Sequence, residues 1–183
     1  MTIKRMLRII RIAFLKNGFK RAEFLKRRKV FAQMGEHCFW QPRNIPPEAK
    51  LIRFGDNVVI ASEVLFVNHD VIHHVFNGMN RDENTYFRLN LGAIEIGNNV
   101  FIGSRSVILP GTKIEDNVII GAGAVVSGKI SRGGVYVGVP AKRIGAFDDV
   151  IEKRKMNSPE LRKKTERFQE EWENFKRKYG ESE

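Results

Sequence analysis

The sequence predicts a mainly β protein built as a parallel β-helix, with α-helices flanking it at both ends. Two eighteen-residue stretches repeat: 96–113 is IGNNVFIGSRSVILPGTK and 114–131 is IEDNVIIGAGAVVSGKIS. An aliphatic residue recurs in them at every sixth position, at Ile96, Ile102, Ile108, Ile114, Ile120 and Val126. Strands alternate with period two and helices with period 3.6, so a sustained period of six indicates a solenoid of three-sided coils.

The same period occurs upstream, in residues 54–70 (FGDNVVIASEVLFVNHD). Its inward positions are Phe54, Ile60 and Phe66. The next coil is expected at residue 72 but begins at 96, which predicts a 24-residue insertion that leaves the coils directly after residues 68–70. Residues 34–45 fit the period loosely and Pro46-Pro47 marks an irregular first coil, so we expect about four coils and a partial one from Val135.

Asparagines occupy one corner of successive coils. Asn57, Asn99 and Asn117 each follow an inward residue by three positions. Asn tolerates the left-handed backbone conformation that tight corners need. We therefore expect positive φ angles at these three residues.

Residues 1–33 are predicted to form a basic amphipathic helical region. Residues 1–30 contain eleven Lys or Arg and one Glu, a net charge of +10, whereas the other 153 residues carry 21 basic and 20 acidic side chains. Apolar residues recur there at helical spacing on one face. They are Ile3, Met6, Leu7, Ile10, Ala13 and Phe14. Two roles remain open for this helix: peripheral binding to an anionic membrane surface, or packing beneath the first coil as a cap.

Composition limits the cellular setting. Charges interrupt every apolar run before it reaches the length of a signal-peptide core or a membrane span, so we expect a cytoplasmic protein that lies at most peripherally on the inner face of a membrane. The single Cys38 agrees, because one cysteine forms no disulfide within a chain.

Residues 148–183 are predicted to form a C-terminal helix. Ser158-Pro159 has the chemistry of a helix start. A narrow stripe follows at alternating spacings of four and three: Leu161, Thr165, Phe168, Trp172, Phe175 and Tyr179. We expect this stripe to pack on the solenoid or on a neighbouring subunit.

The hexads resemble those of the hexapeptide-repeat acyltransferases, and within them the galactoside, maltose and capsular-sugar O-acetyltransferases. The motifs are FGDNVVIA at 54–61, VNHD at 67–70, IGNNVFIGSRSVILPG at 96–111, VIIGAGAVV at 118–126 and GVPAKRI at 138–144. The resemblance implies a left-handed β-helix over residues 34–147 with an insertion loop at 71–93, although parallel crossovers are generally right-handed. It also implies a homotrimer with active sites at the subunit interfaces.

The resemblance further implies transfer of an acetyl group from acetyl-CoA to a sugar or saccharide hydroxyl, with surface polysaccharide biosynthesis as one setting. We expect no metal requirement and no nucleic-acid partner. The acceptor stays open, because its contacts fall in the aperiodic residues 71–93. Antibiotics and other small molecules remain alternative acceptors.

His69 is the candidate general base. It ends a regular coil just before the insertion, so a rigid element supports a side chain that faces an open cleft. Acyl transfer to a hydroxyl needs a base that is neutral near pH 7, and imidazole meets that need. His73 and His74 are the competing candidates in the insertion. Asp70 is expected to support the ring, and Asn68 and His74 to contact the acceptor.

The donor site is expected along the later coils. By the resemblance, small residues that let the pantetheine arm approach the backbone are Gly103, Ser104, Ala122, Gly123 and Ser127. The same resemblance implies that the Ser104 amide faces the thioester oxygen and that Phe101 lines the acceptor site. Lys142 and Arg143 are expected to meet the CoA phosphates. The segment 127–131, SGKIS, departs from the Thr-Lys-Asp-Ile-Pro of relatives.

Two other classes use such solenoids. Gamma-class carbonic anhydrases bind zinc through three histidines from separate strands, whereas the histidines here cluster at one insertion. A non-catalytic scaffold is the other alternative, but it needs no histidine beside a long insertion.

Overall fold

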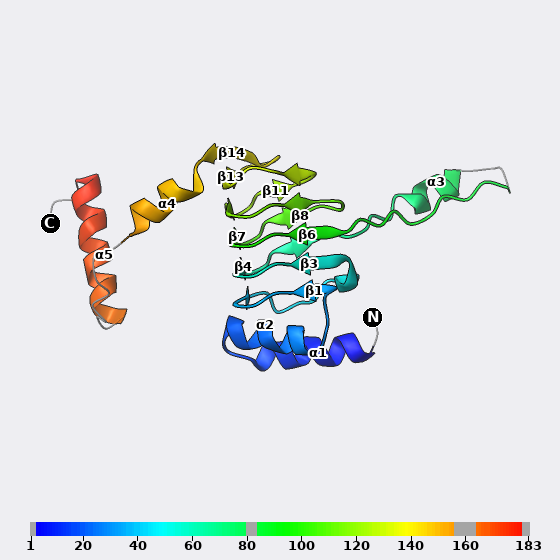
Figure 1. Cartoon of the computed structure of the whole chain (residues 1–183), viewed down its shortest axis with the longest axis horizontal. Helices are drawn as coiled ribbons and strands as arrows, with labels where there is room; N and C mark the ends of the chain where they lie inside the picture. The colour runs from blue at the N-terminus through cyan, green and yellow to red at the C-terminus, as the bar shows by residue number, and fades with distance from the viewer. Residues whose placement is uncertain (1–2, 80–83, 156–163, 181–183) are drawn as a thin grey trace. The chain divides into compact units, whose positions relative to one another are not determined.

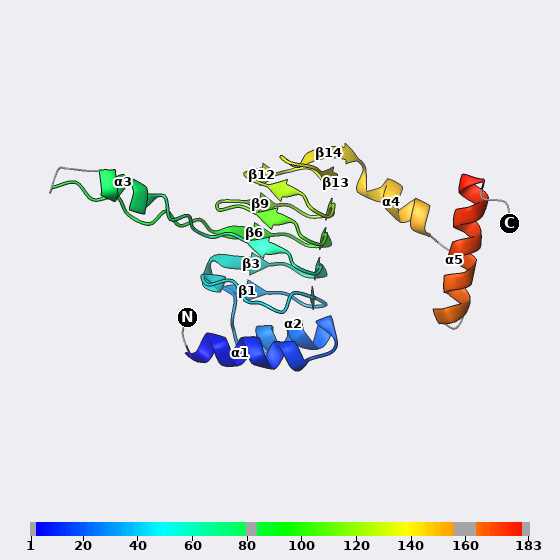
Figure 2. The same ribbon diagram turned by 180° about the vertical axis from the view of Figure 1, so that it is seen from behind.

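The strands form three sheets that the chain visits in turn (Figures 1 and 2). The computed structural model describes residues 3–79, 84–155 and 164–180. The first sheet contains β1 (Gln33–Met34), β3 (Ile52–Phe54), β6 (Ile94–Ile96), β9 (Lys113–Ile114) and β12 (Lys129–Ile130). The second contains β2 (Phe39–Trp40), β4 (Val58–Ile60), β7 (Val100–Ile102), β10 (Val118–Ile120), β13 (Gly134–Val137) and β14 (Lys142–Gly145). The third contains β5 (Leu65–Phe66), β8 (Val107–Ile108) and β11 (Val125–Val126).

One passage through the three sheets is one coil. Three coils have a strand in every sheet, the first coil has β1 and β2, and the partial last coil has β12 and β13. The partial coil thus begins at β12, a few residues before the predicted Val135. All strand pairs are parallel except the pairing of β13 with β14.

Strand register confirms the predicted repeat. Ile96 pairs with Ile114, eighteen residues later, and Phe54 pairs with Ile96, 42 residues later. The second offset exceeds the first by 24, which confirms the predicted insertion. The six inward aliphatic residues of the repeat are each at most 1% exposed, so the stacked hexads form the core.

The asparagine corner is also as predicted. Asn57, Asn99 and Asn117 have φ angles of 55°, 55° and 57°. The Nδ2 of Asn57 donates to the Oδ1 of Asn99 at 2.9 Å, and the Nδ2 of Asn99 donates to the Oδ1 of Asn117 at 3.0 Å. The side chains therefore link successive coils in addition to allowing the corner.

Large aromatic rings fill the N-terminal end of the core in place of aliphatic side chains. Trp40 and Phe66 stack with ring centroids 5.9 Å apart, and Phe31 lies 5.1 Å from Trp40. Phe54 packs edge-on to Phe66 at 5.6 Å. All four rings are buried. They lie in the first two coils, and the first of these is irregular, with the 3-10 helix η1 (Ala49–Leu51) in place of a third strand.

Two helices cover this end of the coils (Figure 1). They are α1 (Ile3–Phe14) and α2 (Gly18–Arg27). Asn17 starts the second helix, since its side chain accepts a 2.8 Å hydrogen bond from the amide of Phe19. Helix α1 packs through Ile12, which is fully buried, and Ile9. The predicted apolar stripe lies on the other side, with Ile3 73% exposed.

The insertion forms an arm that projects from the coils and carries α3 (His73–Met79) (Figure 1). Asn77 links the outgoing and returning segments of the arm. Its Nδ2 donates to the carbonyl of Phe87 at 2.9 Å, and its Oδ1 accepts from the amide of Phe87 at 2.8 Å. Many apolar side chains of the arm are exposed, including Met79 and Tyr86.

The chain divides into two compact units, 1–150 and 151–183. The helix α4 (Phe147–Arg154) spans this division, and the second unit contains α5 (Lys164–Tyr179). Four residues of the predicted aromatic stripe are exposed on α5: Phe168, Trp172, Phe175 and Tyr179. The predicted helix start at Ser158-Pro159 and the stripe residue Leu161 lie outside the described residues. Within the described parts of the chain, every helix is too short or too polar to cross a bilayer.

Candidate active site

His69 lies at the root of the arm, where the chain leaves and rejoins the coils. It forms an isolated antiparallel bridge with Leu91. Beside it, the amide of Gly92 donates to the carbonyl of Asn68 at 2.7 Å, and the Nδ2 of Asn68 donates to the carbonyl of Gly92 at 3.1 Å. Asn68, predicted as an acceptor contact, is only 2% exposed. In this chain it holds the root of the arm and thereby fixes the backbone of His69.

A carboxylate orients the His69 ring. The Nδ1 of His69 lies 2.8 Å from the Oε2 of Glu48, and the two side chains are 28% and 30% exposed. A carboxylate accepts hydrogen bonds, so this contact assigns the proton of the neutral ring to Nδ1 and leaves the Nε2 lone pair available as a base. Glu48 precedes η1 and makes no capping hydrogen bond with its side chain.

Asp70, predicted to support the ring, makes its hydrogen bonds to the arm. Its Oδ1 accepts from the amide of Ile72 at 3.0 Å, and its Oδ2 accepts from the Nδ2 of Asn90 at 3.2 Å. Asp70 therefore links the outgoing and returning halves of the arm. The carboxylate at the ring is Glu48, which the sequence interpretation missed.

The competing histidines lie on α3, out along the arm (Figure 1). The rings of His73 and His74 are 4.1 Å apart and tilted by 36°. His74, a predicted acceptor contact, is exposed there. Within one chain, the fold places His69 beside the coils and the other two histidines away from them.

Four of the predicted donor residues, Gly103, Ser104, Ala122 and Gly123, lie at the corner between the second and third sheets. Ser104 and Ala122 hold equivalent positions on successive coils, and their backbone amides donate no hydrogen bond to any described residue. Gly103 is required by close stacking, because a Cβ there would approach the amide nitrogen of Ala122 to 2.5 Å. Gly123 has a φ of 71°, which glycine adopts without strain. The corner thus presents two free amides beside small side chains.

His69 and this donor corner lie on different edges of the coil. His69 follows β5, at the edge between the third and first sheets, whereas Ser104 follows β7, at the edge between the second and third. By strand register Ser62 is the equivalent of Ser104 in the coil of His69, so seven residues of chain across the third sheet separate the two edges, on the order of 20 Å. Ser127 is exposed on the edge of His69, two coils further along. One chain therefore carries the two halves of the predicted site without bringing them together.

The other predicted contacts lie in the second sheet. Phe101 is in β7 and 38% exposed. Lys142 and Arg143 are exposed in β14, which folds back antiparallel on β13. The Nε of Arg143 donates to the carbonyl of Gly133 at 3.2 Å. The sequence interpretation did not predict this hairpin, which holds the two cations at the C-terminal end of the coils.

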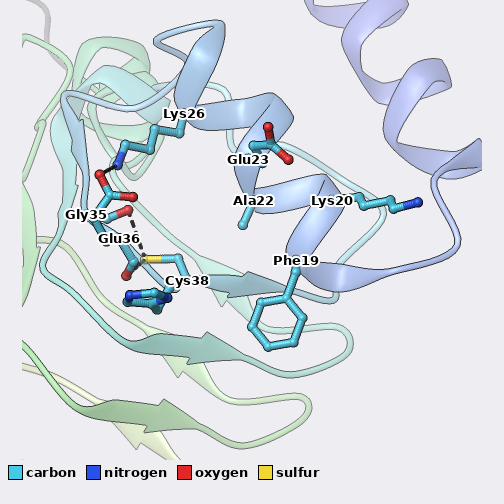
Figure 3. Close-up of a pocket in the computed structure, with 9 residues that line it drawn as sticks. Phe19, Lys20, Ala22, Glu23, Lys26, Gly35, Glu36 and Cys38 are labelled. Atoms are coloured by element: carbon cyan, nitrogen blue, oxygen red, sulfur yellow. Dashed lines mark hydrogen bonds and ion pairs between the residues drawn. The ribbon is translucent and has the colours of Figure 1, made fainter.

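A hollow of about 250 Å³ lies elsewhere, between α2 and the first coil (Figure 3). It contains the ion pair of Lys26 and Glu36. Cys38 lies at its floor, only 6% exposed, with its Sγ 3.4 Å from the carbonyl oxygen of Gly55. Burial raises the pKa of the Cys38 thiol above its usual range. The thiol therefore stays protonated near neutral pH and is a poor nucleophile.

We expect iodoacetamide to alkylate Cys38 in the folded protein at least about tenfold more slowly than in the urea-unfolded chain, because the thiolate is the reacting form. Mass spectrometry at pH 8 measures the reaction cleanly, since the chain has one cysteine. Equal rates in the two states would contradict the burial of this thiol.

Known proteins share both the repeat and the fold. A family model described as bacterial transferase hexapeptide (six repeats) matches residues 93–128. Galactoside O-acetyltransferase of Escherichia coli (strain K12) is 34% identical over 151 residues, which cover 71% of this chain and 70% of that protein. A galactoside acetyltransferase solved in complex with coenzyme A has a TM-score of 0.52 and 25% identity, covering 86% of this chain and 89% of its own.

A maltose O-acetyltransferase from Clostridium difficile 630 is similar to the same extent, with a TM-score of 0.52 and 26% identity over 79% of this chain and 87% of its own. The similarity to the Escherichia coli enzyme covers more than two thirds of each protein. Together with the confirmed hexad register, it establishes that this chain belongs to the hexapeptide-repeat transferase family and is an acetyltransferase.

Proposed function

We propose that this protein transfers an acetyl group from acetyl-CoA to a hydroxyl of a sugar or saccharide, with His69 as general base. The observation that carries the proposal is the contact of His69 with Glu48 at the root of the arm, in a chain similar to galactoside and maltose O-acetyltransferases. A neutral imidazole held by a carboxylate is suited to removing a hydroxyl proton near pH 7.

The reaction follows from these groups. The acceptor oxygen attacks the thioester carbonyl carbon while the Nε2 of His69 takes the hydroxyl proton. The carbon–sulfur bond then breaks, and the imidazolium returns the proton to the leaving CoA sulfur. Glu48 acts as a positioning residue, because it touches the ring and not the reacting atoms, and its negative charge stabilises the imidazolium that forms between the two steps.

The free amide of Ser104 is the proposed donor to the oxyanion of the tetrahedral intermediate. A preorganised donor aimed at that oxygen contributes about 3 kcal/mol to transition-state stabilisation. The equivalent free amide of Ala122, one coil further, supports a pantetheine arm that runs along the donor corner. Gly123, where an added Cβ would meet no atom within 4 Å, leaves room for that arm to approach the backbone.

We further propose that the coils wind left-handed and that the protein is a homotrimer with active sites between subunits. The separation of His69 from Ser104 supports the trimer, since a neighbouring copy can bring its donor corner to the edge that carries His69. Exposed apolar side chains on the arm, including Met79 and Tyr86, also support contact with a second copy. Membership of the hexapeptide-repeat family supports the left-handed winding.

A screen with labelled acetyl-CoA tests the proposal. Free sugars, nucleotide sugars and lipid-linked oligosaccharides are the acceptors, and antibiotics are the comparison set. We expect label in a saccharide ester and release of free CoA. Transfer to antibiotics alone, or absence of CoA binding, would contradict the proposal.

Replacing Lys142 and Arg143 together by Ala should raise the KM for acetyl-CoA and weaken its dependence on salt, because both cations are exposed and attract phosphate. Steady-state kinetics at low and high salt measure both effects. The matched control is Lys153→Ala with Arg154→Ala, another adjacent exposed pair, which should leave the KM unchanged. Equal behaviour of the two double variants would place the phosphates elsewhere.

A further inference from the structure

Helix α1 has two apolar sides that point in opposite directions. Ile12 is fully buried against the first coil. Ile3 lies nine residues earlier, about two and a half helical turns, and so on the opposite side of the helix. The exposed stripe on that side has exposures of 73%, 41%, 58%, 48% and 78% at Ile3, Met6, Leu7, Ile10 and Phe14. Packing against the coils therefore accounts for one side of the helix and leaves the other uncovered.

Hydrogen bonds fix the orientation of α1. The Nε and Nη2 of Arg5 donate to the carbonyl of Ile45 at 3.0 and 2.6 Å. At the other end of the helix, the Nη1 of Arg43 donates to the carbonyl of Ala13. The first coil thus holds both ends of α1. The stripe therefore already points away from the coils in the folded protein, and α1 need not rearrange to expose it.

Basic side chains accompany the stripe. Lys4, Arg8 and Arg11 lie along one flank of α1, between its buried and exposed sides. The adjoining α2 adds exposed Lys20 and Arg27. We propose that this end of the coil stack docks on an anionic phospholipid bilayer, with the stripe inserted among the headgroups and the cations beside the lipid phosphates.

A second copy of the chain is a less suitable occupant of the stripe. Residues 1–30 carry a net charge of +10, so pairing two such surfaces would bring like charges together at short range. An anionic bilayer neutralises the same charges and receives the apolar side chains as well. The net positive charge therefore favours an anionic bilayer over a second copy of the chain as the partner of the stripe.

Docking in this way would place the catalytic site near the bilayer. This consequence rests on the proposed function, because it takes His69 as the catalytic base. His69 follows the second coil counted from α1. Two strand spacings and one helix diameter put it on the order of 20 Å from the surface that α1 touches. A saccharide joined to a lipid can present a hydroxyl at that height.

Co-sedimentation of the full chain with vesicles tests the docking. One set of vesicles is phosphatidylcholine, and the other contains about one third phosphatidylglycerol to supply the negative charge of an inner leaflet. We expect binding to the anionic set at low salt, weaker binding at high salt, and little binding to the neutral set. Leu7→Gln with Ile10→Gln should lower binding to the anionic set by about tenfold or more, since both side chains leave the headgroup region.

Matched variants separate the stripe from general surface effects. Ile151→Gln is the apolar control, because Ile151 and Ile10 are both 48% exposed on helices. Arg11→Gln should weaken binding more than Arg154→Gln, because Arg11 lies beside the stripe. Arg154 is the matched control, since each arginine lies in the last turn of its helix. Circular dichroism melting and turnover of a soluble sugar should be unchanged in every variant.

Three results would overturn the proposal. The wild-type protein could stay in the supernatant with anionic vesicles at low salt. The stripe variant could bind as well as the wild type does. The stripe variant could instead change the oligomeric state, which would show that a second copy covers the stripe. None of these measurements needs catalysis, so they fail or succeed independently of the proposed function.

Discussion

Replacing His69 by Ala is expected to lower kcat by about 100-fold or more, the scale of a lost general base. The KM for acetyl-CoA and the melting temperature should stay near their wild-type values, because the proposed role of the imidazole is to move a proton and not to bind CoA. Steady-state kinetics with labelled acetyl-CoA measure the effect. Near-normal turnover in this variant, with His74→Ala inactive instead, would transfer the role of base to the arm.

Glu48→Gln provides the companion measurement. The amide keeps the size of the side chain but loses the negative charge and the fixed acceptor that hold the ring, so kcat should fall by about ten- to a hundredfold. Glu63→Gln is the matched control, because Glu63 is an exposed glutamate that pairs with Arg105. A lower melting temperature with an unchanged kcat would mean that Glu48 is only structural.

Trp40→Ala should destabilise the fold by about 3 to 5 kcal/mol, the usual cost of removing a buried indole. Trp40 is 1% exposed and contacts the rings of Phe31 and Phe66. Its Nε1 has no hydrogen-bond partner among the described residues, so Trp40→Phe should cost much less, because no buried polar group is left behind. Urea unfolding at one fixed protein concentration measures both variants.

The second tryptophan of the chain supplies the control for this series. Trp172 is 66% exposed on α5, and Trp172→Ala should change stability by no more than about 0.5 kcal/mol. It also leaves Trp40 as the remaining indole, so fluorescence then reports the N-terminal end of the core alone. Equal destabilisation by the two alanine variants would show that the aromatic cluster contributes little.

The coils could be predicted because residues that stack on one another in successive coils are separated by a constant number of residues in the sequence. The pairing of Ile96 with Ile114 follows directly from that period. Glu48 could not be found in this way. It lies in the irregular segment between β2 and β3, 21 residues before His69, and only the packing of that segment brings the two side chains together.

The orientation of α1 was also beyond the sequence pattern. The helix carries isoleucines on both sides, and the sequence left open whether the apolar stripe packs beneath the first coil or faces a membrane. In the structure Ile12 and Ile9 pack instead, because Arg5 and Arg43 hold the helix in the other orientation through backbone carbonyls. Long-range hydrogen bonds of this kind leave no periodic signal.

The ends of the coil stack have a consequence for self-assembly. Parallel strands stacked in register are the geometry by which amyloid fibrils grow, since an open terminal strand templates the next layer. At one end α1 and α2 occupy the place of a further layer, and at the other β14 runs antiparallel to β13 with a shift in register. The helices thus cover one terminal face and β14 ends the second sheet, so neither of these places offers the in-register parallel strand that templating requires.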